Sequence, residues 1–82
     1  MNKDTVKNII LASFEELGNE EIIDEDLDLL DAGIMDSLTI MFLISELEEN
    51  LNLHIPMHEV TEESFKSVRS IIKYIFDKME KL

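Results

Sequence analysis

The sequence contains no cysteine and only two glycines. Without cysteine, neither a disulfide bond nor a thiolate zinc site can hold an 82-residue fold together, so its stability has to come from a hydrophobic core. The scarcity of glycine also excludes a glycine-rich loop for nucleotide phosphates. Apolar residues make up 45% of the chain, which is enough for such a core and argues against global disorder.

Long apolar runs are also missing. No stretch could span a bilayer, and the first ten residues lack the apolar segment of a signal peptide. Together with the absence of cysteine, which fits a reducing compartment, this predicts a soluble cytoplasmic protein. At this length, residues 1–82 are expected to form one domain.

Basic residues are missing from the middle of the chain. The net formal charge is −12, and between Asn8 and Phe65 there are sixteen acidic residues but no lysine or arginine. Such a surface repels nucleic-acid phosphates and anionic lipids, which argues against nucleic-acid partners and membrane insertion. It favours encounters with proteins that carry basic patches. An acidic surface that serves only solubility is the alternative.

Apolar residues recur with the period of an α-helix in three segments, and no segment alternates for long like a β-strand. The first spans about residues 5–17 and ends at Gly18, the second spans 37–51, and the third begins near Ser67. The residues expected to face the core are Val6, Ile9, Ile10, Ser13, Phe14 and Leu17 in the first helix, Ile40, Leu43, Ile44, Leu47 and Leu51 in the second, and Val68, Ile71, Ile72, Ile75 and Met79 in the third.

Two connections complete the predicted fold. Pro56 breaks any continuation of the second helix, and Thr61 is expected to cap a short additional helix that Phe65 anchors in the core. The fold class is therefore all-α, a small four-helix bundle of three main helices and a short third one. The connection between the first two helices, residues 19–36, is long for a helix–helix link. The apolar residues expected to pin it to the bundle are Ile22, Ile23, Leu27, Leu30 and Ile34.

The start of the second helix carries the most informative residues. Asp36 is a good N-cap residue, because its carboxylate can accept a backbone N–H of the first helical turn. Counting 100° per residue from the inward stripe places Ser37, Met41, Ser45 and Glu48 on the outer face. A phosphodiester on Ser37 would meet the free N–H groups at the helix N-terminus. A serine that only helps to cap the helix is the alternative.

These residues carry a resemblance to a known family. The stretch Gly33-Ile34-Met35-Asp36-Ser37-Leu38 looks like the Asp-Ser-Leu attachment motif of acyl carrier proteins. The segments Glu46-Leu47-Glu48-Glu49 and Leu53-His54-Ile55-Pro56 resemble the second helix of that family and the loop that follows it. The resemblance covers about residues 5–80 and implies the acyl-carrier-protein fold.

The resemblance also implies a function and a site. A phosphopantetheinyl transferase would join 4′-phosphopantetheine from coenzyme A to Ser37, and the thiol of that arm would hold an acyl or aminoacyl group as a thioester. Asp36 would help the transferase and its magnesium ion to dock. Met41 would be the apolar recognition position for partner enzymes, and Glu48 and Glu49 would meet their basic patches. Such a protein has no catalytic residues of its own and is expected to be a monomer.

Three departures from the family pattern bear on the pathway. Phe42 stands where the family often has glutamate and Ser45 where it often has an apolar residue, which argues against partnership with ordinary fatty-acid synthases. Phe42 and Ser45 are candidate partner-recognition residues beside Met41. The segment from Pro56 to the last helix, which contains Phe65, is longer than in carriers for fatty acid biosynthesis and is similar to that of D-alanyl carrier proteins. A D-alanyl, aminoacyl or peptidyl carrier of a specialised pathway is therefore an alternative to a general acyl carrier. An acidic adaptor without a prosthetic arm remains the alternative of another class.

Two patterns that resemble metal sites are incomplete. Asp24, Asp26 and Asp28 have the spacing that begins a calcium-binding loop, but Leu29 occupies its glycine position and Met35 its bidentate glutamate position. His54 and His58 lie four residues apart, but Pro56 between them prevents regular helical pairing. No metal site is expected.

Overall fold

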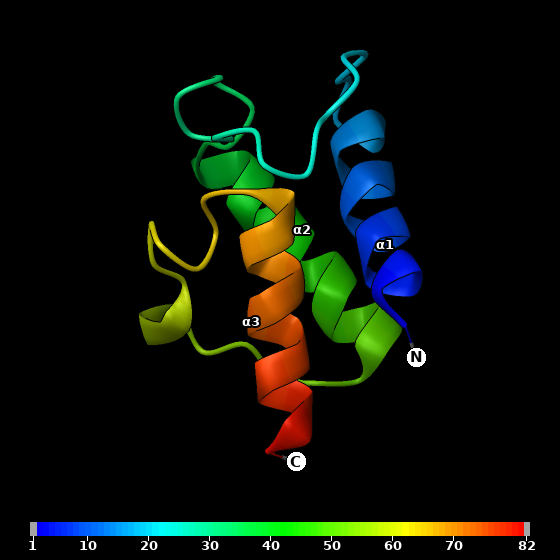
Figure 1. Ribbon diagram of the computed structural model, residues 1–82, viewed down its shortest axis with the longest axis vertical. Coiled ribbons are helices and arrows are strands. Elements are labelled where there is room, and N and C mark those ends of the chain that lie inside the picture. Colours follow the sequence, from blue (N-terminus) through cyan, green and yellow to red (C-terminus); the bar gives the residue numbers. More distant parts are fainter. Residues whose placement is uncertain (1, 82) are drawn as a thin grey trace.

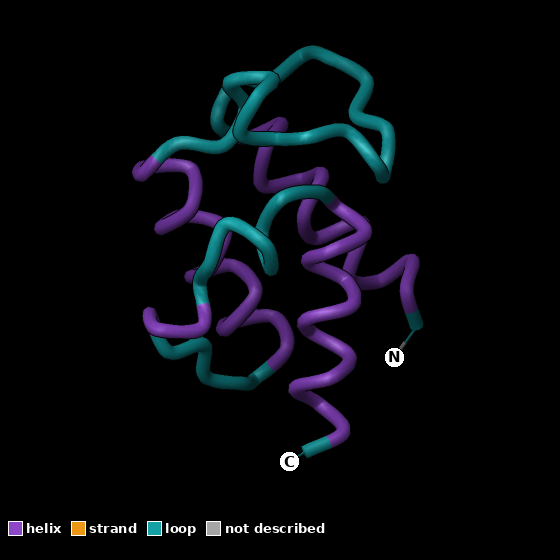
Figure 2. Tube along the Cα trace, turned by 60° about the vertical axis from the view of Figure 1, so that its left-hand side comes forward, coloured by secondary structure: helices purple, strands orange, loops and turns teal. Residues whose placement is uncertain are grey.

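The computed structural model describes residues 2–81. The elements are α1 (Lys3–Glu16), α2 (Ser37–Leu51), the 3-10 helix η1 (Met57–Glu59) and α3 (Val68–Glu80), and no strand occurs in this range. In Figure 1, α1 runs upward while α2 and α3 run downward. The loop between α1 and α2 therefore lies at the same end of the molecule as the starts of α2 and α3, as Figure 2 also shows. The predicted all-α architecture with three main helices is confirmed.

Each main helix begins at a residue whose side chain caps it. The oxygens of Asn2, Asp36 and Ser67 accept the backbone N–H three residues further on, at 3.0, 2.8 and 3.1 Å respectively. Such caps satisfy N–H groups that have no partner within the helix. The predicted starts of the second and third helices are correct to within one residue, and Asp36 is the cap that the sequence indicated for the second.

The core forms where the apolar stripes of the three helices meet, and α1 packs against both α2 and α3. Most of the residues expected to face inward are buried, whereas Ile9, Ile40 and Met79 are only partly buried and pack against the core. Leu17 was expected to be buried but is 39% exposed, because α1 ends at Glu16 and the chain turns away through Gly18, which has a φ of 98°.

The short third helix lies in a different place from the one expected. The 3-10 helix η1 precedes Thr61, and residues 62–65 form turns. Thr61 does cap the turn that follows it, since its hydroxyl accepts the N–H of Ser64 at 3.1 Å and its carbonyl accepts that of Phe65 at 3.0 Å, but this turn does not continue as a helix. Phe65 is nevertheless the predicted anchor, since it is 2% exposed and its ring lies 5.7 Å from that of Tyr74.

The long loop is anchored mainly by Leu29, not by Leu30. Leu29 is fully buried, its N–H donates to the carbonyl of Lys66 at 2.8 Å, and its own carbonyl accepts the N–H groups of Ile34 and Met35. Leu30 is 37% exposed. The backbone bonds around Leu29 decide which leucine points inward, and they depend on the fold of the loop rather than on a helical period.

The other apolar residues of the loop also differ in burial, some packing against the core and one lying in solvent. Ile23, Leu27 and Ile34 are partly buried against the core, as expected. Ile22 is 99% exposed, which contradicts the prediction that it helps to pin the loop. Its neighbour Ile23 takes the inward position instead, since the chain between α1 and the turn at Asp24 is not helical.

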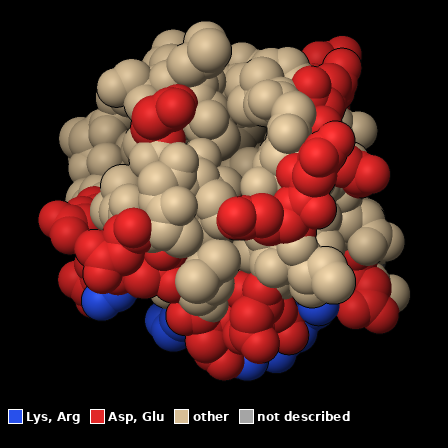
Figure 3. Space-filling model, turned by 90° about the horizontal axis from the view of Figure 1, so that it is seen from above, with Lys and Arg blue, Asp and Glu red and all other residues tan. Residues whose placement is uncertain are grey.

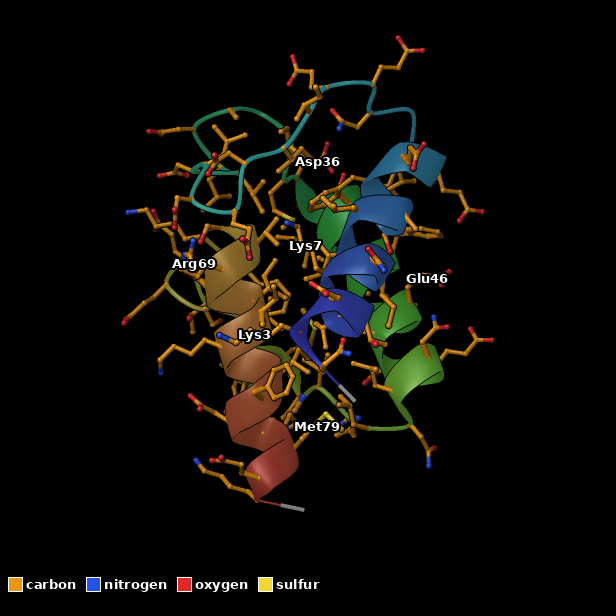
Figure 4. All side chains as sticks on the ribbon, turned by 45° about the vertical axis from the view of Figure 1, so that its right-hand side comes forward. Lys3, Lys7, Asp36, Glu46, Arg69 and Met79 are labelled. Carbon is orange, nitrogen blue, oxygen red and sulfur yellow. The ribbon has the colours of Figure 1, made fainter. Side chains whose placement is uncertain are left out.

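Charged side chains fasten the loop to α1 and α3. Arg69 donates to both carboxylate oxygens of Asp26, at 2.6 and 3.2 Å, and its backbone N–H donates to the carbonyl of Glu25. Lys7 on α1 pairs with Glu25 at 3.7 Å. Figure 4 shows Lys7 and Arg69 on these two helices and Asp36 at the start of α2. The loop therefore has a fixed course from the end of α1 to the start of α2.

Candidate functional site at the start of the second helix

Asp36 and Ser37 have the arrangement that the sequence predicts. Asp36 lies in extended backbone as the N-cap of α2, and its Oδ1 accepts the N–H of Thr39 at 2.8 Å. This backbone hydrogen bond and the Thr39 hydroxyl lower the pKa of the Asp36 carboxyl, so that it is ionised at neutral pH. Ser37 follows in the first turn of the helix and is exposed to solvent. Its hydroxyl is therefore accessible to an enzyme at a helix N-terminus.

The outer face next to Ser37 carries exposed apolar side chains. Met41, one turn further along, is 53% exposed as expected, and Leu38 is 73% exposed. Ser45 is also exposed, and Phe42 lies at the flank of the helix, half-buried. Leu38 was not singled out from the sequence as a surface residue, although 100° steps from Leu43 would have placed it outward. Together, Leu38 and Met41 form an apolar surface beside the serine.

The two glutamates near the end of α2 differ in their environment. The Oε2 atom of Glu48 accepts the N–H of Ile55 at 2.8 Å and lies 3.2 Å from Nδ1 of His54. Glu48 therefore ties the end of α2 to the loop that follows, a role that sequence spacing did not indicate. The side chain of Glu49 is exposed to solvent. A substitution of Glu48 would affect folding as well as any partner, whereas one of Glu49 would report on the surface.

A hollow of about 480 Å³ adjoins Asp36. It lies between the end of α1, two parts of the long loop and the first turn of α2. Its lining residues are Phe14, Leu17, Gly18, Asn19, Glu20, Glu21, Ala32, Gly33, Ile34, Asp36 and Thr39. Sequence reasoning could not find it, because its walls come from segments that only the fold brings together.

The charges at this end of the molecule are unevenly distributed. Figure 3 looks onto the end where α2 begins and shows carboxylates bordering a largely uncharged, hollowed surface, with the visible lysines and arginines along one edge. Acidic residues that face these cations are paired, as Asp28 is with Lys66 at 3.9 Å. The border of the hollow carries carboxylates and no basic residue. A positively charged group is therefore favoured there.

The residues that resembled metal ligands are engaged in local structure. Asp24 accepts the N–H of Asp26, Asp28 accepts those of Leu30 and Asp31, and Asp26 is held by Arg69. Within residues 2–81, no three potential ligands gather into a group that could hold a metal ion. No helix in the same range is long and apolar enough to cross a membrane.

The site thus consists of an exposed serine in the first turn of a capped helix, with an apolar surface beside it and carboxylates around it. The family model described as "Phosphopantetheine attachment site" matches residues 4–75, so the chain belongs to this family of carrier proteins. The prosthetic group of the family is covalently attached 4′-phosphopantetheine. The exposed hydroxyl of Ser37 is suited to such an attachment.

Curated relatives point to a branch of the family. The chain is 37% identical over 75 residues to a D-alanyl carrier protein of Streptococcus suis (strain 05ZYH33), an alignment that covers 90% of this chain and 95% of that protein. It is 37% identical over 70 residues to a D-alanyl carrier protein of Streptococcus uberis, with 84% and 89% covered. Fatty acid biosynthesis, one role open to a member of the acyl carrier family, is not supported by these relatives.

A solved structure has the same fold. A chain in a structure titled "Crystal structure of FAD-dependent dehydrogenase" superposes with a TM-score of 0.71 at 28% identity, covering 85% of this chain and 97% of that chain. The matched chain is therefore about the size of this one. This similarity of fold is consistent with the family assignment.

Proposed function

We propose that this protein carries D-alanine as a thioester on a 4′-phosphopantetheine arm attached to Ser37. The observation that carries the proposal is the exposed Ser37 hydroxyl in the first turn of α2, behind the Asp36 cap. The D-alanyl carrier relatives support the choice of cargo. A general acyl, aminoacyl or peptidyl carrier uses the same site and differs only in what the thiol holds.

The attachment needs little from this chain. The Oγ of Ser37 attacks the phosphorus of coenzyme A that bears the pantetheine, a new O–P bond forms, and the nucleotide half leaves with the electrons of the broken P–O bond. The hydroxyl proton passes to a base of the transferase. Asp36 is ionised and next to the reacting oxygen, so it can meet the magnesium ion of the transferase. The arm supplies a thiol that forms the thioester, and this chain contributes no catalytic group to either step.

The surface residues then serve recognition. Leu38 and Met41 offer an apolar contact beside the arm, with Phe42 and Ser45 at its border. Glu49 attracts basic patches of the transferase and of the enzymes that load and unload the cargo. We place this carrier in the cytoplasm, where coenzyme A is available, as a monomer with one domain over residues 1–82.

The cargo is tested by loading. The arm is attached with coenzyme A and a transferase of broad specificity, and the product is incubated with ATP and the D-alanine-activating enzyme of a streptococcal relative. Mass spectrometry of the intact protein should show D-alanine added, and much less L-alanine under the same conditions. An armed protein that accepts neither amino acid, but is charged by an acyltransferase with an acyl group, would overturn the D-alanyl assignment.

The exposed Leu38 and Met41 would also suit an adaptor that carries no arm. The same experiment separates the two functions, because an adaptor keeps its mass when it is incubated with coenzyme A and the transferase.

A further inference from the structure

The hollow beside Asp36 has a composition that suits one kind of cargo. Its lining includes two apolar side chains that a cargo group can reach, Leu17, which is 39% exposed, and Ile34, which is partly buried. Its border carries the carboxylates of Glu20, Glu21 and Asp36 and no lysine or arginine. A small apolar group that also bears a positive charge can use both parts of this surface. A neutral acyl group can use only the apolar part.

We infer that this hollow receives the aminoacyl end of the arm, with the α-ammonium group near the carboxylates and the small side chain against Leu17 and Ile34. The inference rests on the proposed function, because the arm has to be attached at Ser37. Asp36 lines the hollow and directly precedes Ser37, so the arm begins at its edge. Because the arm is long and flexible and starts at the edge of the hollow, its free end can fold back into the hollow.

The contact would favour the protonated amine. An α-amino group titrates at about pH 7.7–8.0 in model peptides, so a fraction is uncharged at neutral pH. Neighbouring carboxylates stabilise the charged form. A protonated amine is not a nucleophile, so the amine of a cargo held in the hollow would not attack a neighbouring thioester. It would also distinguish aminoacyl from neutral acyl cargo.

A second cavity provides the contrast. It measures about 250 Å³ and lies near Leu30, Ile40 and Phe65, with Glu62 as its only carboxylate-bearing lining residue. It is apolar and does not include Asp36. A neutral chain would suit this cavity better than an ammonium group. We therefore expect charged cargo at the hollow beside Asp36 and uncharged cargo at the second cavity.

The test compares two cargoes that differ in one group. From the corresponding coenzyme A derivatives, the transferase attaches phosphopantetheine arms that carry D-alanyl or propionyl groups through a stable amide to Ser37, and amide ¹H–¹⁵N spectra are recorded at neutral pH. The propionyl group has the same carbon chain without the ammonium. The D-alanyl form should show additional shifts at Gly18, Gly33 and Thr39, which line the hollow, and the propionyl form should not.

Variants show whether the carboxylates are responsible. The double substitution of Glu20→Gln and Glu21→Gln should reduce these additional shifts about two- to fivefold, the range expected from partly exposed ion pairs. Glu62→Gln, which alters only the second cavity, should leave them unchanged. Circular dichroism establishes that each variant keeps its helix content.

Two outcomes would overturn the inference while the proposed function stands. One is that the D-alanyl and propionyl forms show the same amide shifts for the residues that line the hollow. The other is equal shifts in the double variant and in the wild type. A protein that never accepts an analogue at Ser37 would instead overturn the proposed function itself.

Discussion

The adjacent residues Leu29 and Leu30 provide a sharp test of how the long loop is held. Leu29 is fully buried and at the centre of three backbone hydrogen bonds, whereas Leu30 is 37% exposed. In Leu29→Ala the lost side chain leaves a cavity, and fully buried Leu→Ala changes cost about 3–5 kcal/mol. For a domain of this size that corresponds to a fall in Tm of roughly 10–40 °C. Leu30→Ala should cost less than about 1 kcal/mol.

Thermal and urea denaturation, followed by circular dichroism, measure the two variants against the wild type. Because the substitutions are chemically identical and adjacent, effects on the unfolded chain largely cancel. The urea midpoint of Leu29→Ala should fall strongly, and that of Leu30→Ala should stay near the wild-type value. Equal losses in both variants, or a larger loss in Leu30→Ala, would refute the described course of the loop.

Three further predictions concern the start and the outer face of α2. Asp36→Ala should lower the Tm, while Asp36→Ser should keep most of the wild-type Tm because serine also caps helices. Because the pKa of Asp36 is lowered on folding, its contribution to stability is present above pH 3.8 and is lost as the pH falls further. In acid titrations the stability of Asp36→Ser should not show this loss. Met41→Glu should slow arm attachment or cargo transfer with unchanged helix content, and unfolding of this variant would contradict the outward orientation of Met41. Glu49→Lys should slow attachment by the transferase chiefly at low salt without changing the Tm, whereas Glu48→Lys should lower the Tm; rates of Glu49→Lys equal to wild type at every ionic strength would exclude electrostatic steering.

The parts of the structure that the sequence predicted are those set by local rules. The helical periods located α1, α2 and α3, and the side chains of Asp36 and Ser67 marked where helices begin. The outward orientation of Ser37 and Met41 follows from helix geometry alone, once the inward stripe of α2 is known.

The errors lie in segments without a regular period. The choice between Leu29 and Leu30 depends on a hydrogen bond to Lys66, which is distant in sequence. The short helix of the described residues is the 3-10 turn Met57–Glu59, which precedes Thr61, and the turn that Thr61 caps is not extended into a helix. The tie from Glu48 to Ile55 and the hollow beside Asp36 likewise form between segments, so neither was visible in a linear pattern.

The most direct test of the central claim is to locate the arm. After incubation with coenzyme A and a transferase of broad specificity, the intact mass should rise by one phosphopantetheine, and fragmentation of the peptide around residues 33–41 should place it on Ser37. Ser37→Ala, with its helix content preserved, should gain nothing. An unmodified but folded wild-type protein, or an arm found on another residue, would contradict the account.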